Sequence, residues 1–307
     1  MELNFKHALV ALDQSDASDI IIDCLGYFKQ FGTKKFTLFT SVSVSYPGGL
    51  SQKSEERFSE KLEEYRQRLE PLGIEIETEA AFKTNAYAPT QILNAANEHQ
   101  ADFIIIANRG YNKFREFLLG STATELLQRC DLPVYLINLS VSDETNVEDR
   151  KLYCVKSCQQ SLHHIFYPTD FSSTADRAFS VLKNLVSEKT ENITLLHVQA
   201  TGRPGVDDPD QLEEFDKIDM KRLDSLKKEL QPTSNAEIEI LIRHGSPSKQ
   251  ILENAEMFGA TMIILGSQGR GYVSDLFLGG VSLQVIRKAH IPVLTVPADR
   301  NNEINPE

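Results

Sequence analysis

The sequence predicts an α/β protein of two tandem domains, each built on a doubly wound parallel sheet of five strands. One pattern occurs twice: an offset of 159 residues places Gln91-Ile92-Leu93 over Gln250-Ile251-Leu252, and Pro133-Val134 over Pro292-Val293. In each copy short apolar runs alternate with amphipathic stretches, which is typical of β-α units around a parallel sheet. The length of 307 residues is enough for two domains of ordinary size.

Ten short apolar runs are the expected strands. Central runs such as Phe103–Ile106 are apolar at every position, as in a sheet that helices cover on both faces. The expected strands are Ala8–Leu12, Phe36–Thr40, Glu75–Ala81, Phe103–Ala107 and Val134–Ile137 in the first copy, and Ile165–Tyr167, Ile193–Val198, Glu237–Ile242, Met262–Leu265 and Val293–Val296 in the second.

Helical periods lie between these runs. Apolar residues recur at three- and four-residue steps over residues 58–69 and 175–185, and a further helix is expected over Leu283–Ala289. Each copy therefore reads as alternating strands and helices that begin and end on a strand. Right-handed crossovers would wind such a sheet doubly, and ligands of these sheets bind at the carboxyl ends of the strands.

The repeat sets the domain boundaries. We expect domain 1 over residues 1–140, a linker over 141–162 and domain 2 over 163–300. Residues 142–149 are polar and acidic, which is typical of a solvated linker.

The composition excludes some classes of partner. The net charge of −12 argues against binding to nucleic acid, which needs a basic face. No apolar run approaches the roughly 20 residues of a membrane span, and no secretory signal is visible. We expect a cytoplasmic protein with neither nucleic-acid nor membrane partners.

Four cysteines are too few for a disulfide scaffold, and a cytosolic chain would keep them reduced. We interpret Cys24 and Cys130 as small buried apolar residues. Cys154 and Cys158 could be combined with His163-His164 as zinc ligands, but these spacings do not match the usual structural patterns. We therefore expect no metal site.

One segment of the second copy has the features of a phosphate-binding loop. Strand Met262–Leu265 leads into Gly266-Ser267-Gln268-Gly269, and nine residues later Gly279-Gly280-Val281-Ser282 opens the next helix. Glycines let backbone N–H groups approach a ligand, and a helix N-terminus favours an anion. Ser282 adds a hydroxyl, and Asp170 follows the first strand at the same sheet edge, where it could accept hydrogen bonds from a ribose or base.

This Gly-x2-Gly-x9-Gly pattern, followed by a small or hydroxyl residue, resembles the ATP-binding motif of the universal stress protein family. Tyr167–Ser172, Leu195–Val198 and Ile291–Val296 are similar to its first, second and last strands, and the resemblance extends over both copies. It implies an adenine-nucleotide α-hydrolase-like fold and a regulatory role in the stress response. It also implies a ligand that is ATP, with or without Mg²⁺, or another adenine nucleotide, and protein partners that the sequence does not name.

The resemblance assigns nucleotide-binding residues to both copies, mainly to the second. Gly280 departs from the family, which usually has Ser or Thr there, so a phosphate-binding hydroxyl is absent. In the first copy Ala107 replaces the first glycine and puts a Cβ at the strand exit, and Ala123 replaces the final hydroxyl. The assigned residues are Pro168, Thr169, Asp170, Val198, Leu265, Gly266, Gly269, Gly279, Gly280, Val281 and Ser282 in the second copy, and Asp13, Gly110, Gly120, Ser121 and Thr122 in the first.

Other functions stay open. Glycines after a strand and before a helix are common turn residues, so both copies could be structural and the protein a nucleotide-free scaffold acting through protein contacts. An enzyme is less favoured, because the chain has no Walker motif and no obvious base beside the loop, and His197 is expected to be packed; hydrolysis of ATP would be slow at most. Last strands pair across a dimer in the family, so the resemblance implies an intramolecular pseudo-dimer, with a homodimer as a further arrangement.

Overall fold

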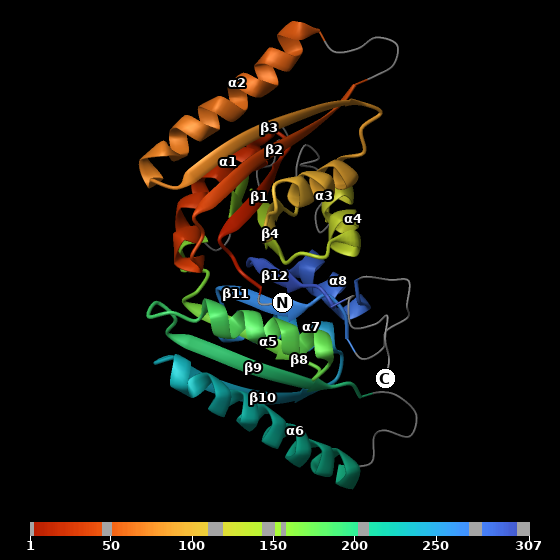
Figure 1. Cartoon of the computed structure of the whole chain (residues 1–307). Coiled ribbons are helices and arrows are strands. Elements are labelled where there is room, and N and C mark those ends of the chain that lie inside the picture. Colours follow the sequence, from red (N-terminus) through yellow and green to blue (C-terminus); the bar gives the residue numbers. More distant parts are fainter. Residues whose placement is uncertain are drawn as a thin grey trace. The chain divides into compact units, whose positions relative to one another are not determined.

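The computed structural model describes residues 3–44, 51–109, 119–142, 151–154, 158–201, 209–269 and 278–299. The chain forms two compact units, Met1–Cys158 and Gln159–Glu307. Each unit contains a sheet of five parallel strands, in the order β3-β2-β1-β4-β5 in the first and β10-β9-β8-β11-β12 in the second (Figure 1). The predicted fold class, two tandem α/β domains with parallel sheets, is confirmed.

The first unit contains all five expected strands. Its strands are β1 His7–Leu12, β2 Lys35–Val44, β3 Glu75–Thr84, β4 Phe103–Ala107 and β5 Val134–Ile137, followed by the short strands β6 Leu139–Val141 and β7 Leu152–Cys154. Its helices are α1 Asp16–Leu25, α2 Gln52–Leu69, α3 Ala88–Glu98 and α4 Ser121–Arg129, with 3₁₀ turns η1 Gly26–Phe31 and η2 Glu70–Leu72.

The second unit repeats this order. Its strands are β8 His164–Thr169, β9 Asn192–Gln199, β10 Glu237–His244, β11 Met262–Gly266 and β12 Val293–Val296. Its helices are α5 Ser173–Leu185, α6 Pro209–Leu230, α7 Pro247–Met257 and α8 Gly280–Lys288. Two 3₁₀ turns are present, η4 Cys158–Gln160 at the boundary between the units and η5 Gln231–Thr233. Helix α8 begins three residues earlier than predicted, because Gly280, Val281 and Ser282 form its first turn.

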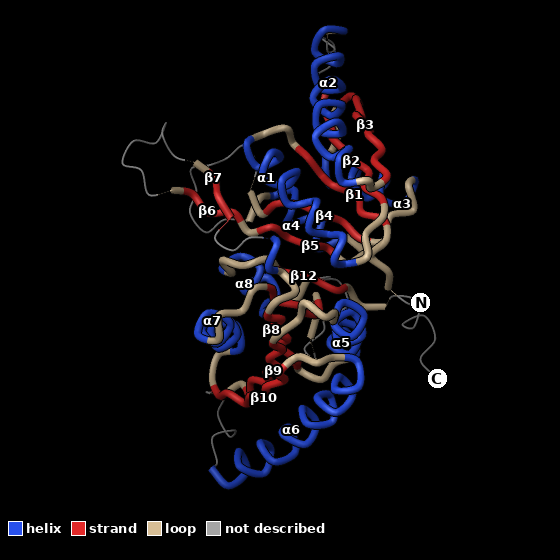
Figure 2. The backbone as a smooth tube through the Cα atoms, turned by 90° about the vertical axis from the view of Figure 1, so that its left-hand side faces the viewer, coloured by secondary structure: helices blue, strands red, loops and turns tan. Residues whose placement is uncertain are grey.

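Helices lie on both faces of each sheet. In the first unit α1 contacts α2 and α3 contacts α4. In the second, Lys183 of α5 pairs with Glu229 of α6, and α7 packs against α8. Figure 2 shows α5 and α6 on one side of the strands and α7 and α8 on the other. This doubly wound arrangement places the end of the first strand next to the end of the fourth.

The two units share local features that fix the first strand and its turn. Ser15 and Ser172 each accept a backbone hydrogen bond at the start of the following helix, as N-cap residues do. Gln14 and Phe171 both have φ of 58°, a left-handed conformation that is uncommon for such residues. In both units the residue before this turn is the expected site aspartate, so the turn fixes the aspartate at the sheet edge.

A histidine–threonine pair also occurs at the same place in each sheet. His7 Nε2 lies 2.9 Å from Thr37 Oγ, and His164 Nε2 lies 2.8 Å from Thr194 Oγ. Burial lowers the pKa of both imidazoles, and nearby Lys35 lowers that of His7 further. The two histidines are therefore part of the repeated core rather than of a surface site.

The segment expected to be a linker contains structure that the sequence analysis did not predict. Strands β6 and β7 pair in an antiparallel ladder, while residues 143–150 between them lie outside the described part of the chain. Cys24 at the end of α1 is buried, as expected, but it forms a disulfide with Cys158 of η4. Our interpretation of Cys24 as a simple apolar residue is therefore wrong. The error arose because 134 residues separate the two cysteines, and only the fold brings them together.

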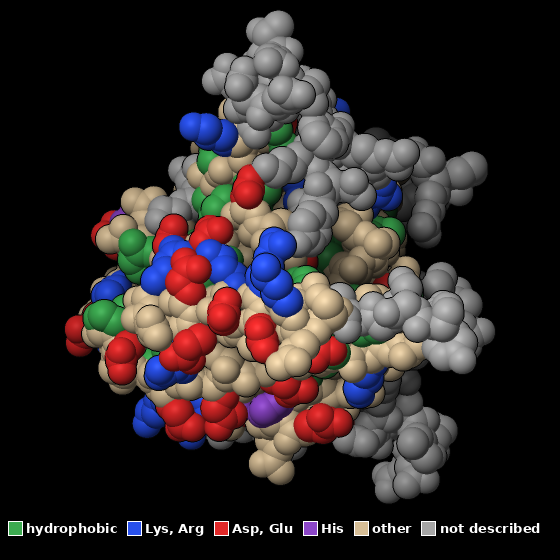
Figure 3. Space-filling view, turned by 90° about the horizontal axis from the view of Figure 1, so that it is seen from above, with side chains coloured by type: hydrophobic (Ala, Val, Ile, Leu, Met, Phe, Trp, Pro, Cys, Tyr) green, Lys and Arg blue, Asp and Glu red, His purple; other side chains and the backbone are tan. Residues whose placement is uncertain are grey.

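No described helix is both long enough and apolar enough to cross a membrane. The face that carries α2 shows acidic and basic side chains interleaved rather than gathered by sign (Figure 3). Ion pairs on that helix, such as Lys61–Glu64 and Arg66–Glu63, account for part of this pattern. This face does not offer the continuous basic surface that nucleic acid requires.

Candidate functional site

In each unit the first and fourth strands are neighbours, and the helices that follow them lie on opposite faces. Such a switch point leaves a crevice at the carboxyl ends of the strands, where ligands of open α/β sheets bind. In the second unit three predicted segments reach this edge: Asp170 after β8, Gly266–Gly269 at the end of β11, and Gly279–Ser282 at the start of α8.

These three segments meet. The Gly279 N–H donates a 2.7 Å hydrogen bond to the Ser267 carbonyl, which ties the start of α8 to the end of β11. Gly269 lies against Asp170, because a Cβ at residue 269 would be 2.5 Å from Asp170 Oδ2. The space that a side chain at 269 would fill is therefore occupied by the aspartate carboxylate. The two glycine segments and Asp170 border one small region.

Gly266 has a packing role that the sequence did not predict. A Cβ at this position would lie 2.8 Å from Thr174 Cγ2 and 3.1 and 3.2 Å from the Thr174 carbonyl carbon and oxygen. The missing side chain makes room for the first turn of α5. The glycine at this position is therefore explained by packing against α5, while its contact with a nucleotide stays a prediction.

The N-terminus of α8 is the part of the region that can receive an anion. The helix has no side-chain cap at Gly279, and its first intrahelical bond runs from the Leu283 N–H to the Gly279 carbonyl. The N–H groups of the first three helical residues precede that bond. A Cβ at Gly280 would meet no atom of the described residues within 4 Å, and Val281 is 40% exposed. Anions bind at helix ends of this kind.

Several predicted residues are buried beside this region, so only their backbones could face a ligand. The Ser282 hydroxyl donates a 2.8 Å hydrogen bond to the Gly266 carbonyl and anchors α8 to β11. Leu265 and Pro168 belong to buried strands, and the Thr169 Oγ accepts the Phe171 N–H at 3.0 Å. Ser282 therefore does not present the free hydroxyl donor that we predicted.

Asp170 is half-buried at the end of β8. Its Oδ1 accepts the Ser172 N–H at 3.1 Å, which closes the turn before α5, while its Oδ2 faces Gly269. The turn includes Phe171 with its positive φ, and strained backbone of this kind is frequent at functional sites. The carboxylate is thus held at the sheet edge by the turn itself.

Residues of β9 form the side of the region next to β8. The β8–β9 pairing ends at Thr169 and His197, one residue before Val198, so the β9 backbone beyond that point is no longer covered by β8. His197 is buried and its Nδ1 donates to the Thr169 carbonyl at 2.7 Å. Asp219 of α6 lies 3.4 Å from its Nε2. The contact with Asp219 was not visible in the sequence, because it depends on how α6, the element that follows β9, packs against that strand.

The first unit has the same framework, but different residues stand at the equivalent positions. The Gly120 N–H donates to the Asn108 carbonyl at 2.8 Å, and α4 begins at Ser121 with no side-chain cap. Ser121 is exposed and Thr122 half-buried in this first turn, whereas the equivalent Gly280 and Val281 of α8 are both exposed. Gly110 lies outside the described residues.

The aspartates of the two units differ most. Asp13 Oδ1 accepts hydrogen bonds from the Ser15 N–H at 3.0 Å, from the Ser15 hydroxyl at 2.5 Å and from the Ser18 hydroxyl at 3.2 Å. Ala175 stands at the position equivalent to Ser18 in the second unit, so that hydroxyl is absent there. Asp13 is engaged in capping its own helix to an extent that the sequence did not indicate.

Comparison with known proteins agrees with the doubled fold. The universal stress protein family matches residues 4–138 and 161–297. Universal stress protein MJ0577 of Methanocaldococcus jannaschii is 32% identical over 154 residues, covering 43% of this chain and 93% of that protein. A universal stress protein of Mycolicibacterium smegmatis is 24% identical over 304 residues, covering 94% of this chain and 96% of that protein.

A solved structure matches nearly the whole length of this chain. The crystal structure of a universal stress protein from Archaeoglobus fulgidus is 25% identical, has a TM-score of 0.65, and covers 97% of this chain and 99% of that one. Both halves of the sequence match the family, and both units have the parallel α/β architecture that the sequence predicted. The chain belongs to the universal stress protein family, with two family domains in tandem.

Proposed function

We propose that the second unit binds an adenine nucleotide, ATP in the first place, and that the protein acts as a nucleotide-dependent regulator in the stress response. The observation that carries the proposal is the uncapped N-terminus of α8, which meets the end of β11 beside Asp170. The family motif on the same residues supports it.

The phosphate groups would lie at the first turn of α8. The N–H groups of Gly280, Val281 and Ser282 supply donors there, and the space above Gly280 is open. A helix terminus favours an anion by about 0.3–1 kcal/mol at exposed sites and up to about 2 kcal/mol when partly buried. Each neutral hydrogen bond adds about 0.5–1.5 kcal/mol. The helix terminus and the backbone hydrogen bonds together support phosphate binding even though Gly280 has no side-chain hydroxyl.

The nucleoside would lie towards β8 and β9. Asp170, fixed by its turn, can accept hydrogen bonds from ribose hydroxyls, and the Val198 backbone lies just beyond the end of the β8–β9 pairing. Gly266, Leu265 and Pro168 would support the site by packing and Ser282 by its bond to Gly266. Mg²⁺ would accompany ATP through the phosphates rather than through a protein cage, as is common for this ion.

We propose that the first unit has a structural or partner-binding role and leaves nucleotide binding mainly to the second. The three hydrogen bonds to Asp13 Oδ1 favour this second candidate function, because a ribose hydroxyl would have to compete with them for that oxygen. We also propose that the two domains associate as an intramolecular pseudo-dimer and that binding, with slow hydrolysis at most, is the activity. Sedimentation of the full chain distinguishes this pseudo-dimer from a homodimer.

A charge placed at the first turn of α8 tests the proposal without disturbing the fold. Val281→Asp puts a carboxylate on an exposed position at a helix N-terminus, where acidic residues stabilise helices. A carboxylate at roughly 6 Å from a phosphate costs about 3 kcal/mol per phosphate charge at an effective dielectric of about 20. We expect the Kd for Mg-ATP, measured by calorimetry, to rise at least about 30-fold, while the melting temperature is maintained.

Thr122→Asp is the matched control, because Thr122 occupies the equivalent helical position in the first unit. It should leave the affinity unchanged. If Val281→Asp binds ATP as tightly as the wild type, the phosphates do not lie at α8 and the proposal fails. If Thr122→Asp abolishes binding instead, the nucleotide belongs to the first unit.

A further inference from the structure

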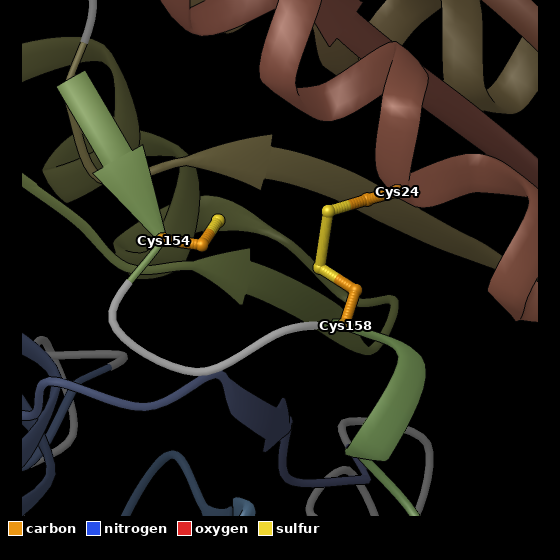
Figure 4. A group of neighbouring side chains, drawn as sticks. All are labelled: Cys24, Cys154 and Cys158. Carbon is orange, nitrogen blue, oxygen red and sulfur yellow. A yellow bond between two sulfur atoms is a disulfide. The ribbon is translucent and has the colours of Figure 1, made fainter. Parts of the chain in front are cut away.

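Three cysteines converge in the first unit, where the fold brings Cys24 to Cys154 and Cys158. Cys24 lies near the C-terminus of α1, Cys154 at the end of β7, and Cys158 in η4. The three sulfur atoms all lie within 4.8 Å of one another, and Figure 4 shows the Cys154 side chain directed towards the other two. Cys24 and Cys158 are joined by a disulfide, and Cys154 is outside it. We call these residues the three-cysteine cluster.

The arrangement of the sulfurs is triangular rather than linear. In thiol–disulfide exchange the attacking sulfur approaches along the line of the bond that breaks. With a bond of about 2.05 Å, an attacker in line and within 4.8 Å of the far sulfur would lie only about 2.8 Å from the near one, too close for atoms that are not bonded. Cys154 is therefore placed beside the disulfide, which does not favour exchange.

A triangle of sulfurs fits a metal ion instead. In tetrahedral zinc sites the Zn–S distance is about 2.3 Å, which places two sulfur ligands about 3.8 Å apart. The cluster needs only small shifts of its side chains to reach that spacing once the disulfide is reduced. Cys24 and Cys158 are buried and Cys154 is half-buried, so the three ligands would lie on the protein side and leave one position open. Thiolates are the ligands that zinc and other soft ions prefer.

The histidines considered from the sequence do not belong to this cluster. His163 Nε2 pairs with Glu191 at 3.0 Å, and His164 Nε2 with Thr194 at 2.8 Å. Cys24, which sequence spacing could not indicate, takes the place of a histidine ligand. The candidate zinc ligands in the structure are therefore three cysteine thiols, and not the two cysteines and two histidines considered from the sequence.

We propose that Cys24, Cys154 and Cys158 form a zinc site in the reduced protein, with three thiolate ligands and an open fourth position. Each thiol loses its proton to the buffer as its sulfur binds Zn²⁺. Because the Cys24–Cys158 disulfide uses two of the three ligands, the disulfide and the metal-bound state exclude each other. A two-electron oxidant such as hydrogen peroxide takes two electrons from these two thiolates, which join in the S–S bond and release the ion, while the peroxide takes two protons from the buffer and becomes two waters. A phosphine reductant reverses it: two thiols form and the phosphine becomes its oxide, with oxygen from water.

The test uses the full chain, reduced with a water-soluble phosphine under anaerobic conditions and freed of reductant. Zn²⁺ is titrated against a chromophoric chelator, and Co²⁺ serves as a spectroscopic probe of thiolate coordination. We expect one equivalent of tightly bound zinc, and cobalt spectra with thiolate charge-transfer bands and intense visible bands of tetrahedral geometry. Cys154→Ser should weaken zinc binding at least about tenfold, since even outer-shell changes cost 10–100-fold.

Cys130→Ala is the matched control, because Cys130 is a buried cysteine at the end of α4 and lies outside the cluster. It should bind zinc like the wild type. Cys154→Ser keeps the Cys24–Cys158 pair, so its oxidised form should show the wild-type circular dichroism spectrum and the same disulfide in peptide maps. Unchanged zinc affinity in Cys154→Ser, or no zinc bound by the reduced wild type, overturns the proposal. Peptide maps that show Cys154 sharing the disulfide, without zinc binding, would identify an exchange centre instead.

Discussion

Adding a single methyl group at Gly266 should destabilise the second unit, although Gly266 lies in the glycine motif of the nucleotide region. In Gly266→Ala the new Cβ would lie 2.8 Å from Thr174 Cγ2 and within 3.2 Å of the Thr174 carbonyl group. The Thr174 methyl makes the shortest contact and its backbone carbonyl the next, so the first turn of α5 must move. Overpacking of this kind costs about 1–3 kcal/mol. Alanine also restricts the unfolded chain more than glycine does, which stabilises the folded state by about 0.4–1 kcal/mol. We therefore expect the free energy of unfolding to fall by about 1–2 kcal/mol.

Gly280→Ala is the matched control in the same motif. Its Cβ would meet nothing within 4 Å, and alanine is favoured over glycine in a helix, so stability should rise by about 0.4–1 kcal/mol. The first unit shows how the clash can be relieved. Ala107 stands at the position of Gly266, and Ala17 at the position of Thr174, so a larger strand residue accompanies a smaller helix residue.

The double variant Gly266→Ala/Thr174→Ala copies that pair into the second unit. We expect the two substitutions to couple favourably by about 1 kcal/mol in a double-mutant cycle, because removing Thr174 Cγ2 eliminates the shortest contact. Urea unfolding followed by circular dichroism measures each variant. If Gly266→Ala unfolds at the wild-type urea concentration, or if the cycle shows no coupling, Gly266 is not a packing glycine and our interpretation of its role is refuted.

Two further predictions concern the buried core. Tyr65→Phe should be neutral or slightly stabilising, because no described residue bonds the buried Tyr65 hydroxyl. Tyr167→Phe should cost about 0.5–1.5 kcal/mol of stability, since the Tyr167 hydroxyl donates to the Ala175 carbonyl at 2.7 Å. Equal urea midpoints for the two variants would contradict this prediction. Burial lowers the pKa of His7 and His164 in the folded protein, so below pH 6.5 the unfolded chain binds protons first and the free energy of unfolding falls as pH falls towards the lowered pKa values. Urea midpoints between pH 5 and 8 should show a smaller decline in the His7→Gln/His164→Gln variant, and an equal decline would rule out these groups.

Much of the sheet could be predicted because buried parallel strands carry a continuous apolar signal. Phe103–Ala107, Val134–Ile137 and Val293–Val296 have the predicted bounds. The edge of the first sheet is less clear in the sequence. There β2 and β3 continue through polar residues to Val44 and Thr84, because ladder pairing rather than burial holds them.

The site was only partly predictable, because sequence identifies residue types but not their neighbours. The motif located the start of α8 and the loop beside Asp170. It could not show that Thr174 fills the space at Gly266, nor that the Ser282 hydroxyl bonds a carbonyl. Glycine in a motif is consistent with close approach of a ligand or of another part of the chain, and only packing distinguishes the two.

Comparison of equivalent residues in the two units shows which contacts belong to the shared scaffold, and the glycine motif alone does not. His197 donates to the carbonyl of Thr169, and at the equivalent positions Thr40 donates to the carbonyl of Leu12 at 2.9 Å. A histidine in one unit and a threonine in the other therefore make the same hydrogen bond, from the second strand to the last residue of the first strand. This structural bond explains a buried histidine near the site without a catalytic role.

The two aspartates show the opposite relation. Asp13 and Asp170 are the same residue at equivalent positions, yet serine hydroxyls bond the carboxylate of Asp13, while Asp170 Oδ2 faces the glycine loop that leads to α8. Residue identity at these positions is therefore the same in the two units, while the side chains around the carboxylates differ. Because Ser18 has only Ala175 as its counterpart, the difference between the units depends on a residue outside the motif. For this reason our proposal of a nucleotide in the second unit is based on side-chain contacts, and not on the glycine count.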